Sequence, residues 1–209
     1  MPDVLIKICG LKRKEDIEII NKYPIDFAGF IVDYPLSKRS IGIDTLKALV
    51  SALDRKKTKA VGVFVNKDIK AVIDLLNSGI IDIAQLHGTE DDFYIEKVKN
   101  KTNKTIIKAF EIKEKEDIQK AKNTLADFPL LDKGKGEGSV FNHEFAKGFD
   151  RKFFLAGGLN PENISKAINT LCPYAVDLST YLEDKNGNKD EEKIIRFVNA
   201  IKYNNKQNA

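Results

Sequence analysis

Four side chains that could transfer protons lie in or directly after short apolar stretches of this 209-residue chain. They are Cys9, His87, Asp132 and Asp177. A thiol, an imidazole and two carboxyls are groups that act as general acids and bases. Each also has an ordinary structural explanation when taken alone: Cys9 as a small buried hydrophobe, His87 as a half-buried ring and Asp132 as a loop cap. A shared location in the fold would favour a catalytic site.

A glycine pair provides a second chemical feature, because it could bind an anion. Gly157 and Gly158 follow an apolar run, and Asn160 with Pro161 then begins a helix, with Asn as N-cap and Pro at the first helical position. Free backbone N–H groups and the positive end of a helix together favour phosphate. The alternative explanation of the two glycines is a tight turn.

The elements that must position these groups alternate along the whole chain. Short β-branched runs are followed by segments with apolar residues at helical spacing, which predicts parallel strands joined by helices. The predicted strands are residues 4–10, 26–32, 60–65, 81–86, 105–110, 128–132, 153–156 and 175–179. The predicted helices are residues 14–23, a helix with Asp44 as N-cap, 68–78, 90–100, 115–125, one from 160 and 191–203. A poorly patterned segment at 142–149 replaces one helix, and the tail from 204 is expected to fray.

Eight strand–helix units favour closure of the sheet. We predict the α/β class and a single (β/α)8 TIM barrel, a closed parallel eight-stranded sheet, with residues 1–209 as one domain. An open doubly wound sheet is the alternative, although the first strand–helix turn lacks GxGxxG. In a barrel the active site lies at the C-terminal ends of the strands. The side chains and glycines expected at that rim are Cys9, Arg39, Gln85, His87, Asp132, Gly157, Gly158, Asp177, Ser179 and Thr180.

The first predicted strand has two different faces, because side chains alternate along a strand. Val4, Ile6 and Ile8 form an aliphatic face suited to packing beneath helices. The other face carries Lys7 and Cys9 near the C-terminal end of the strand. An amine beside a thiol is unusual for a plain core, so this face points to a site.

Composition narrows the classes of function. The chain has 35 basic and 31 acidic residues, a net charge of +4, and 42% hydrophobic residues. The charges are mixed in sign and the densest basic run, residues 55–59, has no aromatic neighbours, so we expect no nucleic-acid partner. No apolar run is long enough to span a membrane, and the first twenty residues do not look like a signal peptide. Two cysteines without a Cys/His cluster predict neither a disulfide framework nor a metal site, and a cytoplasmic location is the default.

With these residues in view, the chain resembles the phosphoribosylanthranilate isomerases, tryptophan-biosynthesis enzymes with a (β/α)8 fold. The resemblance covers nearly the whole chain, and seven motifs occur in register. They are KICG (7–10), YPLSKR (34–39), GVFVN (62–66), QLHG (85–88), LLD (130–132), GGLNPEN (157–163) and VDLS (176–179).

The resemblance implies a role for each residue of the rim. It makes Cys9 the general base and Asp132 the general acid of an Amadori rearrangement that needs no cofactor and no metal. It makes Arg39, His87 and Asp177 substrate-binding residues. It assigns a phosphate site to Gly157, Gly158, Ser179 and Thr180. The partner would be a small phosphorylated substrate, and the protein would be a monomer or a homodimer. Cationic neighbours such as Lys7 or Arg39 are expected to lower the pKa of Cys9.

Three departures from the family pattern keep other functions open. Lys133 follows the acid where Thr or Ser is usual, residues 141–143 read FNH where FDW is usual, and Tyr181 stands where a glycine is usual. A glycine there could serve a positive φ or a close approach of phosphate, which a tyrosine would disturb. The alternatives are a related barrel isomerase acting on another phosphorylated aminosugar, and a non-catalytic barrel that binds a phosphate ligand.

Overall fold

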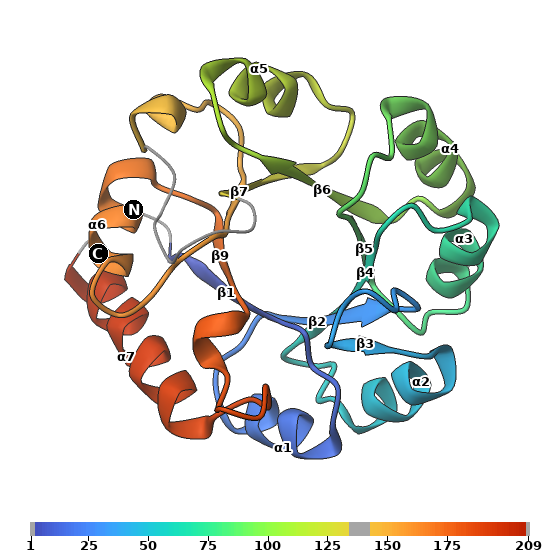
Figure 1. The fold of residues 1–209 in the computed structure, drawn as a ribbon, viewed down its shortest axis with the longest axis horizontal. Coiled ribbons are helices and arrows are strands. Elements are labelled where there is room, and N and C mark those ends of the chain that lie inside the picture. The colour runs from blue at the N-terminus through green and yellow to red at the C-terminus, as the bar shows by residue number, and fades with distance from the viewer. Residues whose placement is uncertain (1–2, 134–142, 208–209) are drawn as a thin grey trace.

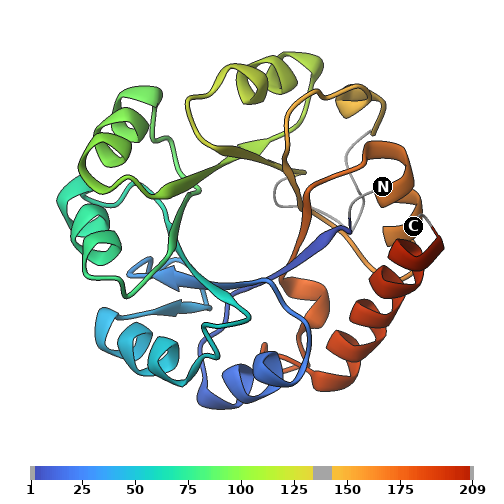
Figure 2. The ribbon, with the colours of Figure 1, turned by 180° about the vertical axis from the view of Figure 1, so that it is seen from behind.

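In the computed structural model, residues 3–133 and 143–207 are described. Within them, eight parallel strands close into a barrel, and helices surround it (Figures 1 and 2). The barrel strands are β1 Leu5–Cys9, β2 Phe27–Val32, β4 Lys59–Phe64, β5 Ile83–Leu86, β6 Thr105–Glu111, β7 Phe128–Asp132, β8 Phe154–Leu155 and β9 Ala175–Leu178. The predicted fold class is therefore confirmed.

The outer ring consists of helices whose apolar faces cover the sheet (Figure 1). They are α1 Lys14–Lys22, α2 Ile43–Ala52, α3 Ile69–Asn77, α4 Asp92–Thr102, α5 Lys115–Asn123, α6 Ile164–Leu171 and α7 Glu191–Gln207, with 3-10 turns η1 His143–Ala146 and η2 Thr180–Leu182. The helix α3 shows why the sequence folds this way. Asp68 caps its start by accepting from the Ala71 N–H, Val72 and Leu76 are buried, and Gly79 follows its end at φ +72°. None of the described helices is long and apolar enough to cross a bilayer.

The barrel closes because the first strand pairs with the second and with the last. Cys9 lies opposite Gly29 of β2, and Lys7 lies opposite Asp177 of β9. Beyond the sheet, the Val4 N–H donates to Asn205 Oδ1 of α7 at 3.2 Å. The two ends of the described chain therefore lie side by side (Figures 1 and 2).

The strands separate two apolar cores. Val4, Ile6 and Ile8 belong to the core between sheet and helices, and Cys9 belongs to the core inside the barrel. The predicted division of the first strand into an aliphatic face and a face that carries Lys7 and Cys9 is confirmed. The inner core narrows toward the N-terminal end, where Phe154 contacts Phe27 and Phe128 edge to face.

Three aspartates tie neighbouring strands together at the N-terminal end of the barrel. Asp26 accepts from the Ile6 N–H, Asp82 from the Ala60 N–H and Asp127 from the Ile106 N–H, each at 2.8 Å. Each aspartate also donates its own backbone N–H to the carbonyl of the same partner residue. These reciprocal bonds join β1 to β2, β4 to β5 and β6 to β7.

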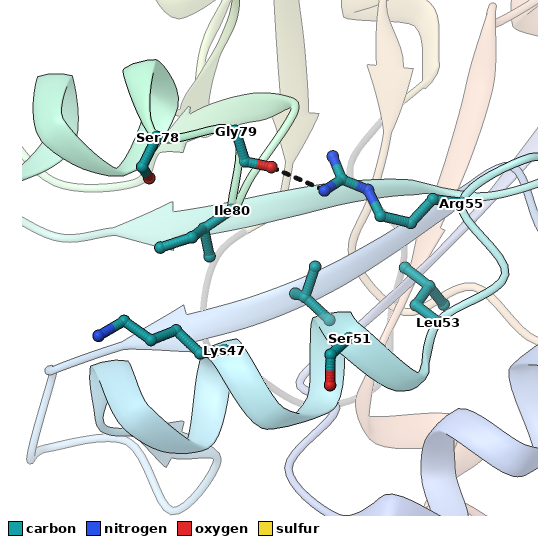
Figure 3. Close-up of a pocket in the computed structure, with 8 residues that line it drawn as sticks. Lys47, Ser51, Leu53, Arg55, Ser78, Gly79 and Ile80 are labelled. Carbon is teal, nitrogen blue, oxygen red and sulfur yellow. Dashed lines mark hydrogen bonds between the residues drawn. The ribbon is translucent and has the colours of Figure 1, made fainter.

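A surface hollow between α2 and α3 lies at this same N-terminal end (Figure 3). Arg55 crosses it, donating to the Gly79 carbonyl at 2.7 Å and pairing with Asp82. The hollow is open to solvent and lies at the end of the strands opposite to the predicted site. We therefore assign it to the stability of the fold, since the N-terminal face of such barrels is where stability resides.

Four local predictions are wrong. The loop before α2 contains a short extra strand, β3 Ser40–Ile41, and the N-cap of α2 is Gly42 rather than Asp44. Asn160 does cap a turn, accepting from the N–H groups of Glu162 and Asn163, but α6 itself begins four residues later. Residues 204–207 continue α7 instead of fraying.

Candidate active site

Cys9 ends β1 and faces into the barrel beside Lys7 and Gly29. A Cβ added to Gly29 would lie 3.0 Å from Cys9 Sγ and 3.0 Å from Lys7 Nζ. The glycine therefore leaves the space that both groups occupy. Burial raises the pKa of Cys9, and the cations of Lys7 and Lys189 offset this only in part. The expectation that the pKa of this thiol is lowered is wrong in direction, because the sequence does not show how deeply the thiol is buried.

Lys7 and Asp177 form an ion pair on the inner wall of the barrel. Lys7 Nζ donates to both carboxylate oxygens of Asp177 at 2.9 Å, and the Lys7 side chain is 0% exposed. Burial alone would lower the pKa of Lys7, but Asp177 and Cys9 raise it above its ordinary value. Asp177 thus lies where the sequence predicts, with its carboxylate directed at a lysine.

His87 and Asp132 face each other from β5 and β7. His87 Nε2 lies 3.8 Å from Asp132 Oδ2, and Gln85 Nε2 lies 3.0 Å from His87 Nδ1. An amide N–H donates, so Nδ1 accepts and the proton of the neutral ring is on Nε2, toward Asp132. Partial burial lowers the pKa of His87, although Asp132 and Asp177 oppose the shift. Gln85 Oε1 is buried without a hydrogen-bond partner among the described residues, which leaves an acceptor inside the barrel.

The glycine pair after β8 lies directly against the acidic end of β7. Gly157 and Gly158 have φ values of +84° and +64°, which favour glycine. A Cβ on Gly157 would lie 2.7 Å from the Lys133 backbone nitrogen and 2.8 Å from Asp132 Oδ1. The pair is thus both a tight turn and the wall against which Asp132 rests, at the entrance to the turn that leads into α6.

Arg39 reaches the mouth of the barrel from the loop before β3. It lies over Gly10, pairs with Glu183 through Nε and Nη2, and donates from Nη2 to Thr180 Oγ1 at 3.1 Å. The hydrogen bonds to Glu183 raise the pKa of Arg39. Two of its nitrogens are therefore occupied by a carboxylate within the protein.

Lys189 completes this cluster from below. Its Nζ is buried and donates to the Ser179 carbonyl at 3.0 Å and to Glu183 Oε1 at 3.1 Å. Ser179 Oγ in turn donates to the Cys9 carbonyl at 3.1 Å. The loop after β9 is thus fastened to the end of β1, which brings Ser179 and Thr180 to the rim with Cys9 and Arg39.

Tyr181 does not occupy the mouth of the barrel in the way its replacement of a glycine suggested. Its ring lies 6.3 Å from that of Phe197 in α7 and below Lys193 Nζ, at 6.0 Å. Its φ is not positive. Tyrosine at this position therefore strains no backbone and leans outward, away from the glycine pair.

The sequence analysis missed two buried pairs that shape the rim. The first is Glu183 with Lys189, which lie in a polar stretch without periodicity. The second is Glu90 with Lys108, 3.1 Å apart, in which Glu90 also accepts from the Asn66 and Gly88 N–H groups and so holds the loop that follows His87. A Lys in the middle of the apolar run of β6 was the available signal for the second pair. Residues 134–142, with most of the glycine-rich loop after Asp132 and the start of the FNH segment, lie outside the described residues.

The comparisons with known proteins agree with this geometry. The family model of N-(5'-phosphoribosyl)anthranilate (PRA) isomerase matches residues 6–200. The chain belongs to this isomerase family. An N-(5'-phosphoribosyl)anthranilate isomerase from Endomicrobium trichonymphae is 43% identical over 202 residues, which cover 94% of this chain and 98% of the relative.

Solved structures of the family share the fold of this isomerase chain. The phosphoribosyl anthranilate isomerase from Thermotoga maritima superposes with a TM-score of 0.86 at 31% identity, over 96% of this chain and 99% of that one. A complex of a phosphoribosyl anthranilate isomerase with reduced 1-(o-carboxyphenylamino)-1-deoxyribulose 5-phosphate has a TM-score of 0.84, with the same identity and the same coverage. Membership thus rests on sequence and on fold over nearly the whole chain.

Proposed function

We propose that this isomerase converts N-(5'-phosphoribosyl)anthranilate into 1-(2-carboxyphenylamino)-1-deoxyribulose 5-phosphate, with Asp132 as general acid and Cys9 as general base. The reaction is an Amadori rearrangement in tryptophan biosynthesis. The observation that carries the assignment is the placement of the two groups. They end β7 and β1, three strands apart around an eight-stranded barrel, and both belong to the inner face at the C-terminal end.

The first step is the opening of the ribose ring. Asp132 would donate a proton to the ring oxygen, the bond from that oxygen to C1 would break, and an iminium would form between C1 and the anthranilate nitrogen. His87 supports this role because its Nε2–H is directed at Asp132 Oδ2. A donor in that position stabilises the carboxylate that remains after proton transfer.

The second step is the removal of the proton from C2 by the Cys9 thiolate. The electron pair of the C2–H bond becomes the double bond between C1 and C2, and the iminium nitrogen receives the electron pair of the C=N bond. The resulting enolamine tautomerises to the ketone. Both steps are proton transfers, and the overall reaction is redox neutral, so we expect no cofactor and no metal.

We infer the orientation of the substrate from the charges at the rim. The turn of Gly157 and Gly158, followed by the start of the α6 segment, supports a phosphate site together with Ser179 and Thr180. Arg39, on the other side of Ser179, would orient the anthranilate end. We expect action in the cytoplasm, as a monomer or a homodimer, without nucleic-acid or membrane partners.

The test is a fluorescence assay in which phosphoribosylanthranilate is generated from anthranilate and phosphoribosyl pyrophosphate. The protein should abolish the substrate signal, and Cys9→Ala or Asp132→Asn should each lower kcat about 10²- to 10⁴-fold, the usual contribution of a general acid or base. Cys172→Ala is the matched control, because Cys172 is exposed at the end of α6, far from the inner face. Turnover at the level of the unmodified protein in both site variants would refute the assignment.

A further inference from the structure

We propose that Lys7 is a positioning residue that keeps Cys9 as a thiolate, and that Asp177 acts on Lys7 rather than on the substrate. The inference rests on the proposed role of Cys9 as base. It changes the role of Asp177, which the family resemblance makes a substrate-binding residue. It also gives a function to the buried amine that the first strand carries.

The first argument is the space that Lys7 and Cys9 share. Both lie on the inner face of β1, two residues apart, and both project over Gly29 of the neighbouring strand. Lys7 Nζ and Cys9 Sγ are each 3.0 Å from the position that a Gly29 Cβ would take, and the Lys7 ammonium is a hydrogen-bond donor to the sulfur. The missing side chain of Gly29 thus allows the ammonium to contact the sulfur.

The second argument is the state of Lys7. A lysine with no exposed surface would lose its proton unless an anion held it. Asp177 supplies that anion through two bonds of 2.9 Å, and it is placed opposite Lys7 by the register of β1 and β9. Because both Asp177 oxygens are engaged by Lys7, the carboxylate fixes the position and the charge of the ammonium.

The third argument compares the charged groups that face Cys9. Lys7 and Asp177 come from the barrel wall, Lys189 from the loop after η2 and Arg39 from the loop before β3. Lys189 and Arg39 both pair with Glu183 and act on the sulfur through space. Lys7 is the cation among these that also hydrogen-bonds the sulfur.

The chemical consequence concerns the base step alone. Cys9 must be a thiolate before it accepts the C2 proton, and burial without a cation would keep it as a thiol. When the S–H bond forms, Lys7 keeps its own proton throughout. Its charge then favours release of the proton from sulfur to water before the next turnover. Lys7 would therefore influence kcat and its pH dependence without touching the substrate.

The experiment measures the ionisation of Cys9 in the resting protein, by thiolate ultraviolet absorbance and by the pH dependence of iodoacetamide alkylation. Cys172→Ser is the background, because the exposed Cys172 would also react. Lys7→Met should raise the pH midpoint by about 1 to 3 units, the usual effect of removing an adjacent charge. Lys108→Met is the matched control, since it removes an equally buried lysine that pairs with Glu90 on the helix-facing side. An unchanged midpoint in Lys7→Met, or an equal shift in the control, would overturn the inference.

A second variant covers the case in which Lys7→Met does not fold. In Lys7→Met/Asp177→Leu, apolar side chains replace both members of the pair, an exchange that buried ion pairs often tolerate. Its midpoint should also exceed that of the unmodified protein, and its kcat deficit should shrink about tenfold per pH unit until Cys9 ionises, with KM changed less than about threefold. A deficit that stays constant with pH would indicate a structural role and refute the inference. Full activity of Cys9→Ala would instead refute the proposed base, while the titration of Cys9 would still report on Lys7.

Discussion

Gly29→Ala should inactivate the protein more than it unfolds it. The added Cβ would lie 3.0 Å from Cys9 Sγ, 3.0 Å from Lys7 Nζ and 3.1 Å from Cys9 Cα. One of these contacts is backbone, so both side chains must move by a few tenths of an ångström. The φ of Gly29 is not positive, so alanine introduces no backbone strain. The effect is therefore confined to the position of the thiol and the ammonium.

The expected magnitudes differ between stability and rate. Overpacking by one methyl group costs about 1 to 3 kcal/mol, which lowers Tm by about 2 to 12 °C in a chain of this size. Displacement of a catalytic group by a fraction of an ångström up to 1 Å lowers kcat/KM up to about 10²-fold. Activity at 25 °C should fall by at least about tenfold in protein that is still folded. The loss should appear in the fluorescence assay, with a thermal melt as the measure of folding.

The matched control is Gly62→Ala, in the adjacent strand of the same sheet. Its Cβ would lie 2.8 Å from the Phe64 ring and 2.8 Å from Ile81, which are both in the core under the helices. It should lower Tm by a similar amount and leave kcat/KM within about threefold of the unmodified value. If Gly62→Ala lost as much activity as Gly29→Ala, or if Gly29→Ala remained fully active, the reasoning from shared space at Gly29 would be wrong.

Two further predictions concern stability. Arg55→Ala removes the bonds to Gly79 and Asp82 at the N-terminal end, so it should lower the free energy of unfolding in a urea titration by about 1 to 3 kcal/mol and leave kcat unchanged; a loss of kcat would contradict the assignment of this end to stability. For Glu183, burial raises the pKa but Arg39 and Lys189 outweigh it, so the pKa is lowered from 4.5. Its contribution is therefore complete above about pH 4.5 and is lost as pH falls through the lowered pKa. Glu183→Gln should flatten the acid limb of stability against pH, and an unchanged limb in urea titrations from pH 7 to pH 3 would refute this sign.

Most of the architecture could be predicted from the sequence because each element carries its own local signal. Each of the eight predicted strands corresponds to an observed strand, since β-branched runs bounded by polar residues mark strands wherever they occur. The errors occur where the decisive contact is distant along the chain. Residues 204–207 are polar, yet the helix continues there because Asn205 bonds Val4 and Asn204 bonds Ser165.

The candidate site shows the same division. The strand-end rule brought Cys9, His87, Asp132 and Asp177 to one rim, because parallel strands share a direction. The sequence could not show which of these groups contact each other. The pairing of Asp177 with Lys7 depends on the register of the first and last strands. The rise in the pKa of Cys9 depends on burial, which many separate segments create together.

Barrel closure through the first and last strands also determines when the protein can first be active during its synthesis. Lys7 and Cys9 leave the ribosome near the beginning of translation, but Asp177 and the strand that carries it are made near the end of the described chain. Until then, β1 has an unpaired edge and its buried ammonium has no counterion. A nascent chain that lacks β9 therefore has most of its strands but no complete catalytic centre, so the onset of activity reports the moment at which the ring closes.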